Sequence, residues 1–232
     1  MSLLLSGLNK DESIERSADS VGFSALESDV YQGTIKQAYG IESDGGAKGI
    51  ALELDLDGRT YKETIYFTSG KEKGQKPYYE TKNGKKVFLP GYQTLDDLCA
   101  VTTEQYLASQ ETEEKKVKVY NRDANKELPT DVEVLVDLIG KKVQVGIIKT
   151  IENKWVKGVK TSDTVEKNSI DKVFNEDGFT LNELLAEAEE AEFINTWLDK
   201  NKGVTKDNSK AVAGSNGSEG SPKKSGGLFG KK

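Results

Sequence analysis

The sequence contains no histidine, one cysteine (Cys99) and only four prolines in 232 residues. Without histidine, zinc sites built from His and Cys are excluded, and so is catalysis by Ser-His-Asp or Cys-His arrangements. A single cysteine cannot form a disulfide within the chain, which favours a reducing, cytoplasmic setting. The early apolar run at residues 3–5 is too short for a signal sequence or a membrane span. We therefore expect a protein of the cytoplasm, or of the host cytoplasm if it is viral, with no membrane partner, metal or cofactor.

Large apolar groups are scarce after residue 200, where lysine, glycine, serine and asparagine dominate. Residues 201–232 carry seven lysines and two acids and offer little to bury, so we expect a disordered basic tail. The end of this tail is typical of a short hook for a partner protein, and the alternative is that its charge aids strand binding nonspecifically. The predicted partner-binding residues are Leu228, Phe229, Lys231 and Lys232.

The first strand patterns lie in residues 30–39, which are rich in β-branched and aromatic residues and contain Gly33 as a predicted bulge or bend. Residues 50–56 then alternate between apolar and mostly acidic positions. Asp57 and Gly58 predict a two-residue hairpin, and residues 59–67 return as the partner strand. A bent strand followed by a tight hairpin predicts a small Greek-key barrel of the OB type, although other curved sheets begin in the same way.

Later segments complete the expected architecture. Residues 115–120 and 153–159 have strand patterns, and residues 132–149 contain apolar alternation after Gly-Lys-Lys, whereas residues 121–130 are expected to form a loop. A capping box at Thr94 and Asp97 predicts a short helix. We expect a mainly β fold with peripheral helices, an OB-fold-like Greek-key barrel with an inserted β-finger. Its predicted parts are an N-terminal arm (1–29), an OB-like single-strand-binding core (30–160), an acidic helical segment (161–200) and the disordered tail (201–232).

One stretch, residues 61–92, is both aromatic and basic in an acidic chain. It holds seven aromatic residues and seven lysines against three acids, whereas the whole chain has a net charge of −6. Aromatic rings can stack on unpaired bases while ammonium groups follow the phosphates, so this composition predicts binding of single-stranded nucleic acid. Asn83 and Gly84 predict the tight turn of the β-finger. The predicted DNA-binding residues are Tyr61, Lys62, Tyr66, Lys71, Lys73, Lys76, Tyr78, Tyr79, Lys82, Lys85, Lys86 and Phe88, with Lys116, Lys118 and Trp155 outside the stretch. For Trp155, a core position and a stacking role are equally consistent with the sequence.

Residues 176–199 hold eight acids and no basic residue. Thr180 and Glu183 form a capping box, and an apolar stripe at helical spacing runs from Leu181 to Leu198. This pattern predicts an acidic amphipathic helix docked on the surface, the alternative being a decoy that competes with phosphate.

Three motifs carry a resemblance to a known family: KPYYETKNGKKVFLPGYQTLDDLCAVTT (76–103), LIGKKVQVGIIK (138–149) and GLFGKK (227–232). With these motifs the chain resembles single-stranded DNA-binding proteins of lytic tailed bacteriophages, especially podophages that carry a virion RNA polymerase. The likeness covers residues 30–195 loosely and the motifs more closely.

The resemblance implies an OB-type fold and cooperative coating of single-stranded DNA without strong sequence preference. It also implies roles in replication, recombination and repair, with tail contacts to replication, recombination or transcription proteins. Many such proteins end in an acidic tail with a terminal Phe, whereas the tail here is basic. The partners of acidic tails therefore do not carry over to this chain.

Two other functions fit parts of the sequence. Glu53, Asp55 and Asp57 stand at alternate positions that could hold Mg²⁺ for a nuclease, but such a row is more often the solvated side of an amphipathic strand. The basic finger could also belong to a regulatory or structural module that binds an acidic protein. Cys99 has no histidine to activate it and is expected in the core. We expect a binding protein without catalytic residues.

Overall fold

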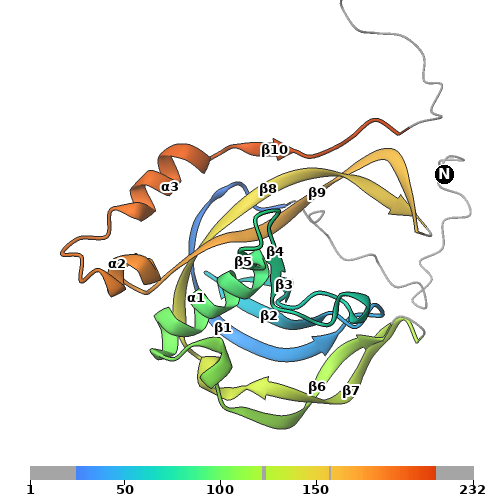
Figure 1. Cartoon of the computed structure of the whole chain (residues 1–232), viewed down its shortest axis with the longest axis horizontal. Coiled ribbons are helices and arrows are strands. Elements are labelled where there is room, and N and C mark those ends of the chain that lie inside the picture. The colour runs from blue at the N-terminus through green and yellow to red at the C-terminus, as the bar shows by residue number, and fades with distance from the viewer. Residues whose placement is uncertain (1–24, 122–123, 157, 213–232) are drawn as a thin grey trace, which may run out of the picture.

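The computed structural model describes residues 25–121, 124–156 and 158–212. Within these residues, mostly antiparallel strands form one eight-stranded sheet and a separate two-stranded sheet (Figure 1). The larger sheet contains β1 (Asp29–Glu42), β2 (Lys48–Leu56), β3 (Arg59–Tyr66), β6 (Thr112–Asn121), β7 (Lys126–Leu135), β8 (Lys142–Val156), β9 (Val159–Phe174) and β10 (Thr205–Asp207). The smaller sheet contains β4 (Tyr78–Glu80) and β5 (Lys86–Phe88). The helices are α1 (Pro90–Thr103), α2 (Leu181–Leu185) and α3 (Phe193–Asn201), with 3₁₀ turns η2 (Lys71–Lys73), η3 (Leu107–Ser109) and η4 (Val136–Leu138). The prediction of a mainly β fold with few helices is confirmed.

β1 pairs with several strands and bends between these pairings. Its residues 29–34 pair with β8 and its residues 34–42 pair with β2, while Tyr39 also pairs with Val134 of β7. At Gly33, an added Cβ would lie 2.5 Å from the Leu56 side chain, so glycine permits the close approach of β1 to the end of β2. The ladder irregularity itself lies a little further on, between residues 35 and 37.

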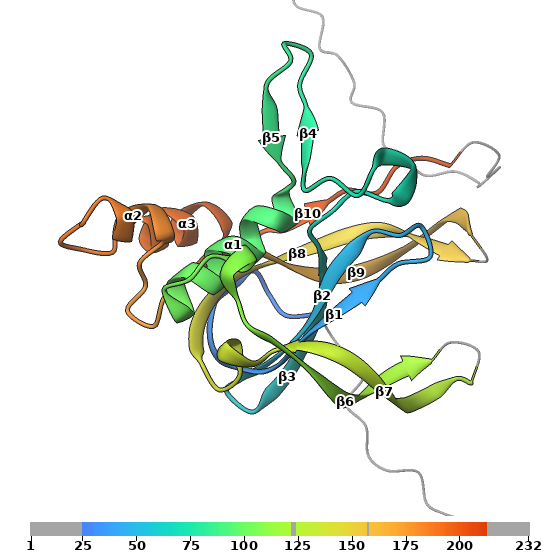
Figure 2. The ribbon, with the colours of Figure 1, turned by 60° about the horizontal axis from the view of Figure 1, so that its bottom comes forward.

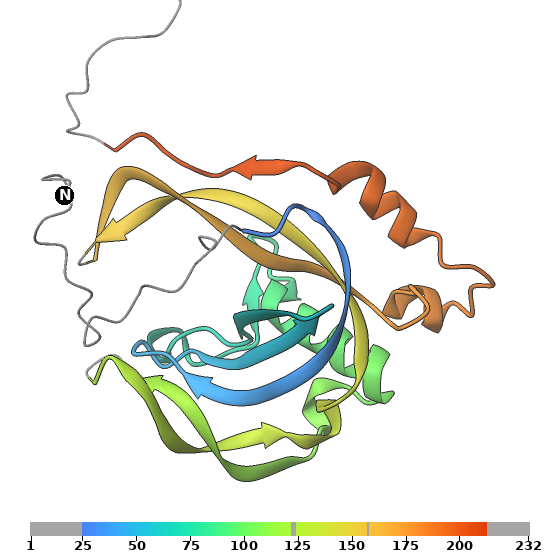
Figure 3. The ribbon, with the colours of Figure 1, turned by 180° about the vertical axis from the view of Figure 1, so that it is seen from behind.

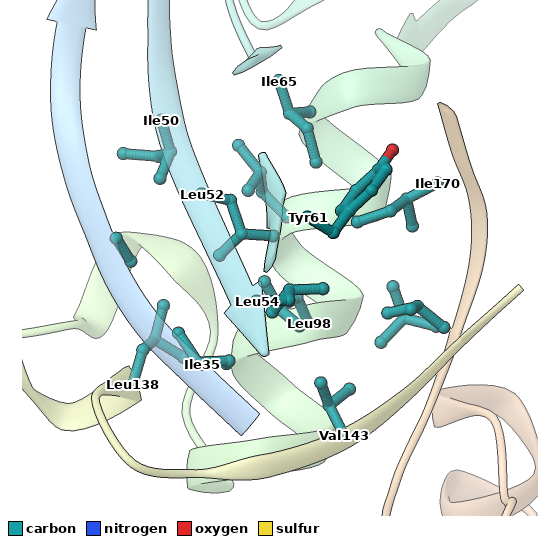
Figure 4. Close-up of a cluster of buried hydrophobic side chains, with 14 of the residues drawn as sticks. Ile35, Ile50, Leu52, Leu54, Tyr61, Ile65, Leu98, Leu138, Val143 and Ile170 are labelled. Carbon is teal, nitrogen blue, oxygen red and sulfur yellow. The ribbon is translucent and has the colours of Figure 1, made fainter. Parts of the chain in front are cut away.

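The predicted hairpin between β2 and β3 is confirmed. Asp57 and Gly58 have φ angles of 50° and 84°, the left-handed pair that a two-residue turn of this hand requires. The alternation predicted for β2 also holds, because its apolar side chains point into the core together with those of β8 and α1 (Figure 4). The buried residues of α1 are Leu95, Leu98 and Cys99.

α1 begins earlier than the sequence indicated. Pro90 occupies its first turn after Leu89 as N-cap, and Thr94 instead donates its hydroxyl to the Pro90 carbonyl oxygen (3.1 Å). The predicted capping box at Thr94 and Asp97 is therefore wrong. Cys99 lies in the core as expected, and burial raises the pKa of its thiol to about 12.

A side chain connects the two ends of the curved sheet. Among the described strands no backbone pairing joins β3 to β9, so the sheet is not a closed barrel. Glu63 of β3 instead accepts hydrogen bonds at Oε2 from the backbone N–H of Ile170 in β9 and from the Tyr61 hydroxyl, both at 2.8 Å. Burial raises the pKa of Glu63, because the charged form is poorly solvated there.

Two predicted boundaries are wrong. β7 begins at Lys126, inside the segment expected to be a loop, and includes Pro129, which is compatible with a strand that is paired on one edge over most of its length. The core also continues past residue 160, because β9 pairs with β8 along its length. Most side chains in the first half of β9 are exposed, so its sequence is polar and lacks the apolar alternation that marks a buried strand.

The acidic segment forms two short helices instead of one long stripe. The capping box at Thr180 and Glu183 is confirmed, but the chain turns after α2, where Glu187 has a φ of 51°. α3 docks through Trp197, which packs against Gly146 of β8 and donates its indole N–H to Asp171 (2.8 Å). Docking of this segment on the surface is thus confirmed for α3.

The chain beyond Asn201 is ordered for longer than predicted. β10 pairs in parallel with β8, and the Lys210 N–H donates to Asn153 (2.7 Å). Disorder from residue 201 is therefore wrong for residues 201–212. The first 24 residues of the predicted arm, and the tail residues Leu228, Phe229, Lys231 and Lys232, lie outside the described residues.

Candidate nucleic-acid interface

The outer face of β1, β2 and β3 carries three rows of side chains that point away from the core. They alternate with the buried residues, as successive residues of a strand must. We call these nine residues the trough: Ile41, Gly49 and Tyr66 in the first row, Tyr39, Ala51 and Thr64 in the second, and Gln37, Glu53 and Lys62 in the third.

The middle strand of the trough, β2, has small residues there, because Gly49 and Ala51 lie between larger residues of β1 and β3. The Tyr66 ring lies over Gly49, where an added Cβ would be 2.9 Å from the ring carbon Cδ1. Tyr39 lies on the other side, in β1. The Tyr66 ring therefore covers the floor at Gly49 and Tyr39 borders it at Ala51, and the flat face of a base can lie against either ring.

The β6–β7 hairpin forms a wall beside this floor (Figure 3). Between the hairpin and the third row lies a hollow of about 410 Å³. Its floor includes Tyr39, Lys62 and Thr64, and its hairpin side consists of Lys118, Tyr120 and Glu127. Tyr120 is 57% exposed, so its ring is available to a ligand in the hollow.

A second hollow of about 590 Å³ lies further along β1 and β2, at residues 40–42 and 48–50. We call it the end pocket. Its other walls come from the start of α1, from η3, from the start of β6 and from the end of β7. The larger apolar residues of this lining are Ile41, Ile50, Phe67, Tyr92, Leu107, Val132 and Leu135.

The two hollows are more acidic than basic. Their lysines are Lys48, Lys62 and Lys118, whereas six carboxylate side chains line them. Lys62 is also held by Glu53, with 3.0 Å between Nζ and Oε2. Positive charge lies instead around the hollows, on the finger, on η2 and along β6.

The finger, residues 77–89, stands out from the body as its own two-stranded sheet (Figure 2). Tyr78 and Phe88 are paired and share one face, whereas Tyr79 points to the other face and is 49% exposed. The face of Tyr78 is already occupied, because Lys86 Nζ lies 4.9 Å and Lys76 Nζ 5.8 Å from its ring centroid. Phe88 stacks on Tyr92 at 4.5 Å.

The structure therefore divides the predicted DNA-binding residues among several places. Lys62 and Tyr66 belong to the trough, and Lys118 faces it from β6. Lys71 and Lys73 lie in η2, with Lys71 ion-paired to Glu42. Tyr78, Tyr79, Lys82, Lys85, Lys86 and Phe88 belong to the finger, Lys76 immediately precedes it, and Lys116 pairs with Asp131 in β7.

Tyr61 and Trp155, two of the predicted DNA-binding residues, differ in their exposure. Tyr61 is wrong as a DNA contact, because it is 8% exposed and its hydroxyl is bonded to Glu63 inside the protein. Trp155 is not a core residue, since it is 63% exposed near the end of the β8–β9 hairpin. It stays a candidate for stacking, on a different hairpin from the finger.

Sequence reasoning missed Tyr39, Tyr92 and Tyr120 as candidate ligand contacts. The alternation of β1 contained the signal for Tyr39, which is one residue from the buried Ala38. Tyr92 ends the aromatic stretch 61–92, and Tyr120 follows the predicted Lys116 and Lys118, but only the folded chain brings these two tyrosines beside the hollows.

The carboxylates considered for Mg²⁺ have other partners. Asp55 pairs with Lys36 (3.3 Å) and accepts from the Gly58 N–H, while Asp57 lies in the turn and not on the strand face. In the part of the chain that the structure describes, no three His, Cys, Asp or Glu residues are grouped to hold a metal.

No family model matches the chain, and no curated protein matches it significantly. Among the helices of the described residues, none has the length and apolar character needed to cross a membrane.

Proposed function

We propose that this protein binds single-stranded DNA, with the bases in the trough and the phosphates toward the surrounding lysines. The observation that carries this proposal is the trough itself, in which the Tyr66 ring lies over Gly49 and Tyr39 lies beside the small Ala51. Stacking on aromatic rings tolerates any base, because every base has a flat face.

The strand connections support an OB-type relationship. β1 bends between β2 and β8, and α1 follows β3 and precedes β8 and β9. In OB folds the face around the second and third strands binds oligonucleotides. The trough lies on β1, β2 and β3, so an OB-type relationship would give it the role of that face, with β6–β7 as an insertion beside it.

The distribution of charge favours bases inside and phosphates outside. The carboxylates that line the hollows repel phosphate, whereas Lys118 on the hairpin side and Lys82 and Lys85 on the projecting finger can attract it. A duplex hides its base faces, so this arrangement favours an unpaired strand. Roles in phage replication and recombination, with contacts through the tail, complete the proposal and rest on the three motifs.

The test compares fluorescein-labelled single-stranded DNA with the matching duplex, using fluorescence anisotropy and the full chain. We expect tighter binding of the single strand and a strong decrease in affinity with salt. A parallel incubation with Mg²⁺ monitors cleavage of the labelled strand. Equal binding of strand and duplex would refute the proposed use of the trough, and cleavage would favour the nuclease. Capture of an acidic polypeptide without DNA binding would favour the regulatory module.

A further inference from the structure

The end pocket differs from the hollow beside the β6–β7 hairpin in size and in lining. Its volume of about 590 Å³ lies within the range of ligand sites, which is roughly 300–1,000 Å³. Phe67, Tyr92 and Leu107 give it apolar walls, whereas most residues that line the hollow beside the hairpin are polar. A flat, mostly apolar group therefore fits the end pocket better than the smaller and more polar hollow.

Tyr92 is a prearranged platform in this pocket. One side of its ring is stacked on Phe88 of the finger, with 4.5 Å between centroids and 15° between planes. The stack fixes the ring before any ligand arrives, so little side-chain freedom remains to be lost on binding. The finger thereby supports the pocket, although its own residues do not line it.

Gln110 lines the pocket, and its buried side-chain oxygen has no hydrogen-bond donor within the described part of the chain. Its amide Nε2 donates to the Thr103 hydroxyl oxygen (2.8 Å) and to the Gln105 carbonyl oxygen (2.9 Å), which fixes the amide orientation. Its Oε1 is the one buried side-chain nitrogen or oxygen of the described residues without a hydrogen-bond partner. A buried acceptor in this condition destabilises the protein until a donor reaches it.

The charged residues at the pocket disfavour a phosphate. Glu42, Asp131 and Glu133 line it, with Lys48 as the only lysine among the lining residues. Glu42 is held by Lys71 at 2.7 Å and Asp131 by Lys116 at 3.8 Å. Oxygen acceptors therefore predominate, and they fit a neutral group that carries N–H donors.

We infer that the end pocket holds one nucleobase turned out of the bound strand and prefers a base with an exocyclic amino group. This inference rests on the proposed single-strand binding and adds a base preference to it. The base lies against Tyr92, and its amino group donates to Gln110 Oε1. That oxygen is closed to water in this conformation, so the η3 turn shifts slightly as the base enters, and binding supplies the missing hydrogen bond.

Cytosine and uracil separate this preference from size, because they share a ring and differ in an amino group at C4 against a carbonyl oxygen. We would bind the full chain to thymidine oligonucleotides that carry one central dC or one central dU. The expected result is about threefold to tenfold tighter binding of the dC strand, which corresponds to one hydrogen bond. A dC at the extreme end of the strand gives a smaller gain, since it reaches the pocket only when few nucleotides fill the trough.

Two variants test the pocket and one serves as a control. Gln110→Leu removes the acceptor and is expected to make dC and dU equal while the dU strand still binds. Val132→Phe fills the pocket and is expected to do the same, which covers the case in which Gln110→Leu fails to fold. Gln93→Leu, an exposed glutamine of α1, keeps the preference.

Each outcome has one meaning. Tight but equal binding of dC and dU by the wild type overturns the inference and leaves the proposed function intact. Failure to bind either strand overturns the proposed function itself. A dC preference that survives both Gln110→Leu and Val132→Phe shows that the end pocket is not the site of discrimination.

Discussion

The finger and the trough are both aromatic and polar, yet they are built in opposite ways. The finger comes from one continuous stretch, and its aromatic residues already have partners, because Tyr78 contacts Lys86 and Phe88 stacks on Tyr92 of α1. The trough is assembled from alternate residues of three strands, and it leaves Tyr39 and Tyr66 beside a low floor. The finger is rich in lysine, whereas the hollows at the trough are rich in carboxylates.

The difference between finger and trough separates attraction of the phosphates from stacking of the bases. The amino-acid composition of residues 61–92 does not distinguish these two contributions. Lysines on a projecting hairpin act on a charged strand over a distance set by salt, about 10 Å at 0.1 M. Rings beside a shallow floor act only on contact. We therefore expect the finger to influence how binding depends on salt, and the trough to supply the affinity that salt does not remove.

The largest effect is expected from Glu63→Ala, which perturbs the sheet beneath the trough and leaves the finger untouched. The substitution leaves the Tyr61 hydroxyl and the Ile170 N–H without their acceptor, at about 1–3 kcal/mol for each buried group. Urea unfolding measures the loss. If the finger alone bound DNA, the folded fraction of this variant would keep wild-type affinity.

Glu63→Gln is the matched control, because both bonds go to one oxygen atom that glutamine retains. Burial raises the pKa of Glu63 in the folded protein above the value near 4.5 that applies to the unfolded chain. The protonated Glu63 therefore stabilises the fold fully below about pH 4.5, and this contribution is lost as pH rises through the folded-state pKa. Wild-type stability should thus fall relative to Glu63→Gln as pH rises from about 4.5. If the difference in stability between wild type and Glu63→Gln stayed constant with pH, Glu63 would not carry a buried charge that lacks compensation.

The next effect concerns the trough directly. Replacing Tyr39 and Tyr66 by alanine should weaken single-strand binding by about 1–3 kcal/mol for each base that loses its ring. Tyr106→Ala is the control, because Tyr106 is an exposed tyrosine that lines neither hollow. Anisotropy titrations at constant salt give the comparison. Unchanged affinity in the double variant would move the binding site to the finger.

The sequence predicted those features whose signal is local. The Asp57–Gly58 turn, the finger around Gly84 and the buried Cys99 all follow from short patterns. The trough does not, because its rows depend on the register between strands. Tyr61 was misassigned since composition does not tell which of two alternate residues faces inward, although its spacing from the buried Ile65 indicated the core. β9 was missed because most of its length is solvated on both faces.

A smaller effect is expected within the finger. Tyr79 is open and Tyr78 is covered by lysines, so Tyr79→Ala should weaken binding by up to about 1 kcal/mol while Tyr78→Ala changes it less. Sequence composition alone treats the two tyrosines as equivalent. An equal loss in both variants would show that the finger rearranges on DNA so that both rings stack.

Replacing lysines of the finger should give the smallest change in binding free energy at physiological salt. This change should depend strongly on salt, which distinguishes it from the other effects. Lys85 and Lys86 flank the start of β5, and in the double Gln variant each lost phosphate contact lowers the slope of log K against log salt by about 0.7. Lys118→Gln tests the trough side in the same way. If only the Lys118 slope changes, the strand follows β6 and the finger serves mainly to hold Tyr92. If only the finger slope changes, phosphates follow the finger, and Lys118 makes no phosphate contact.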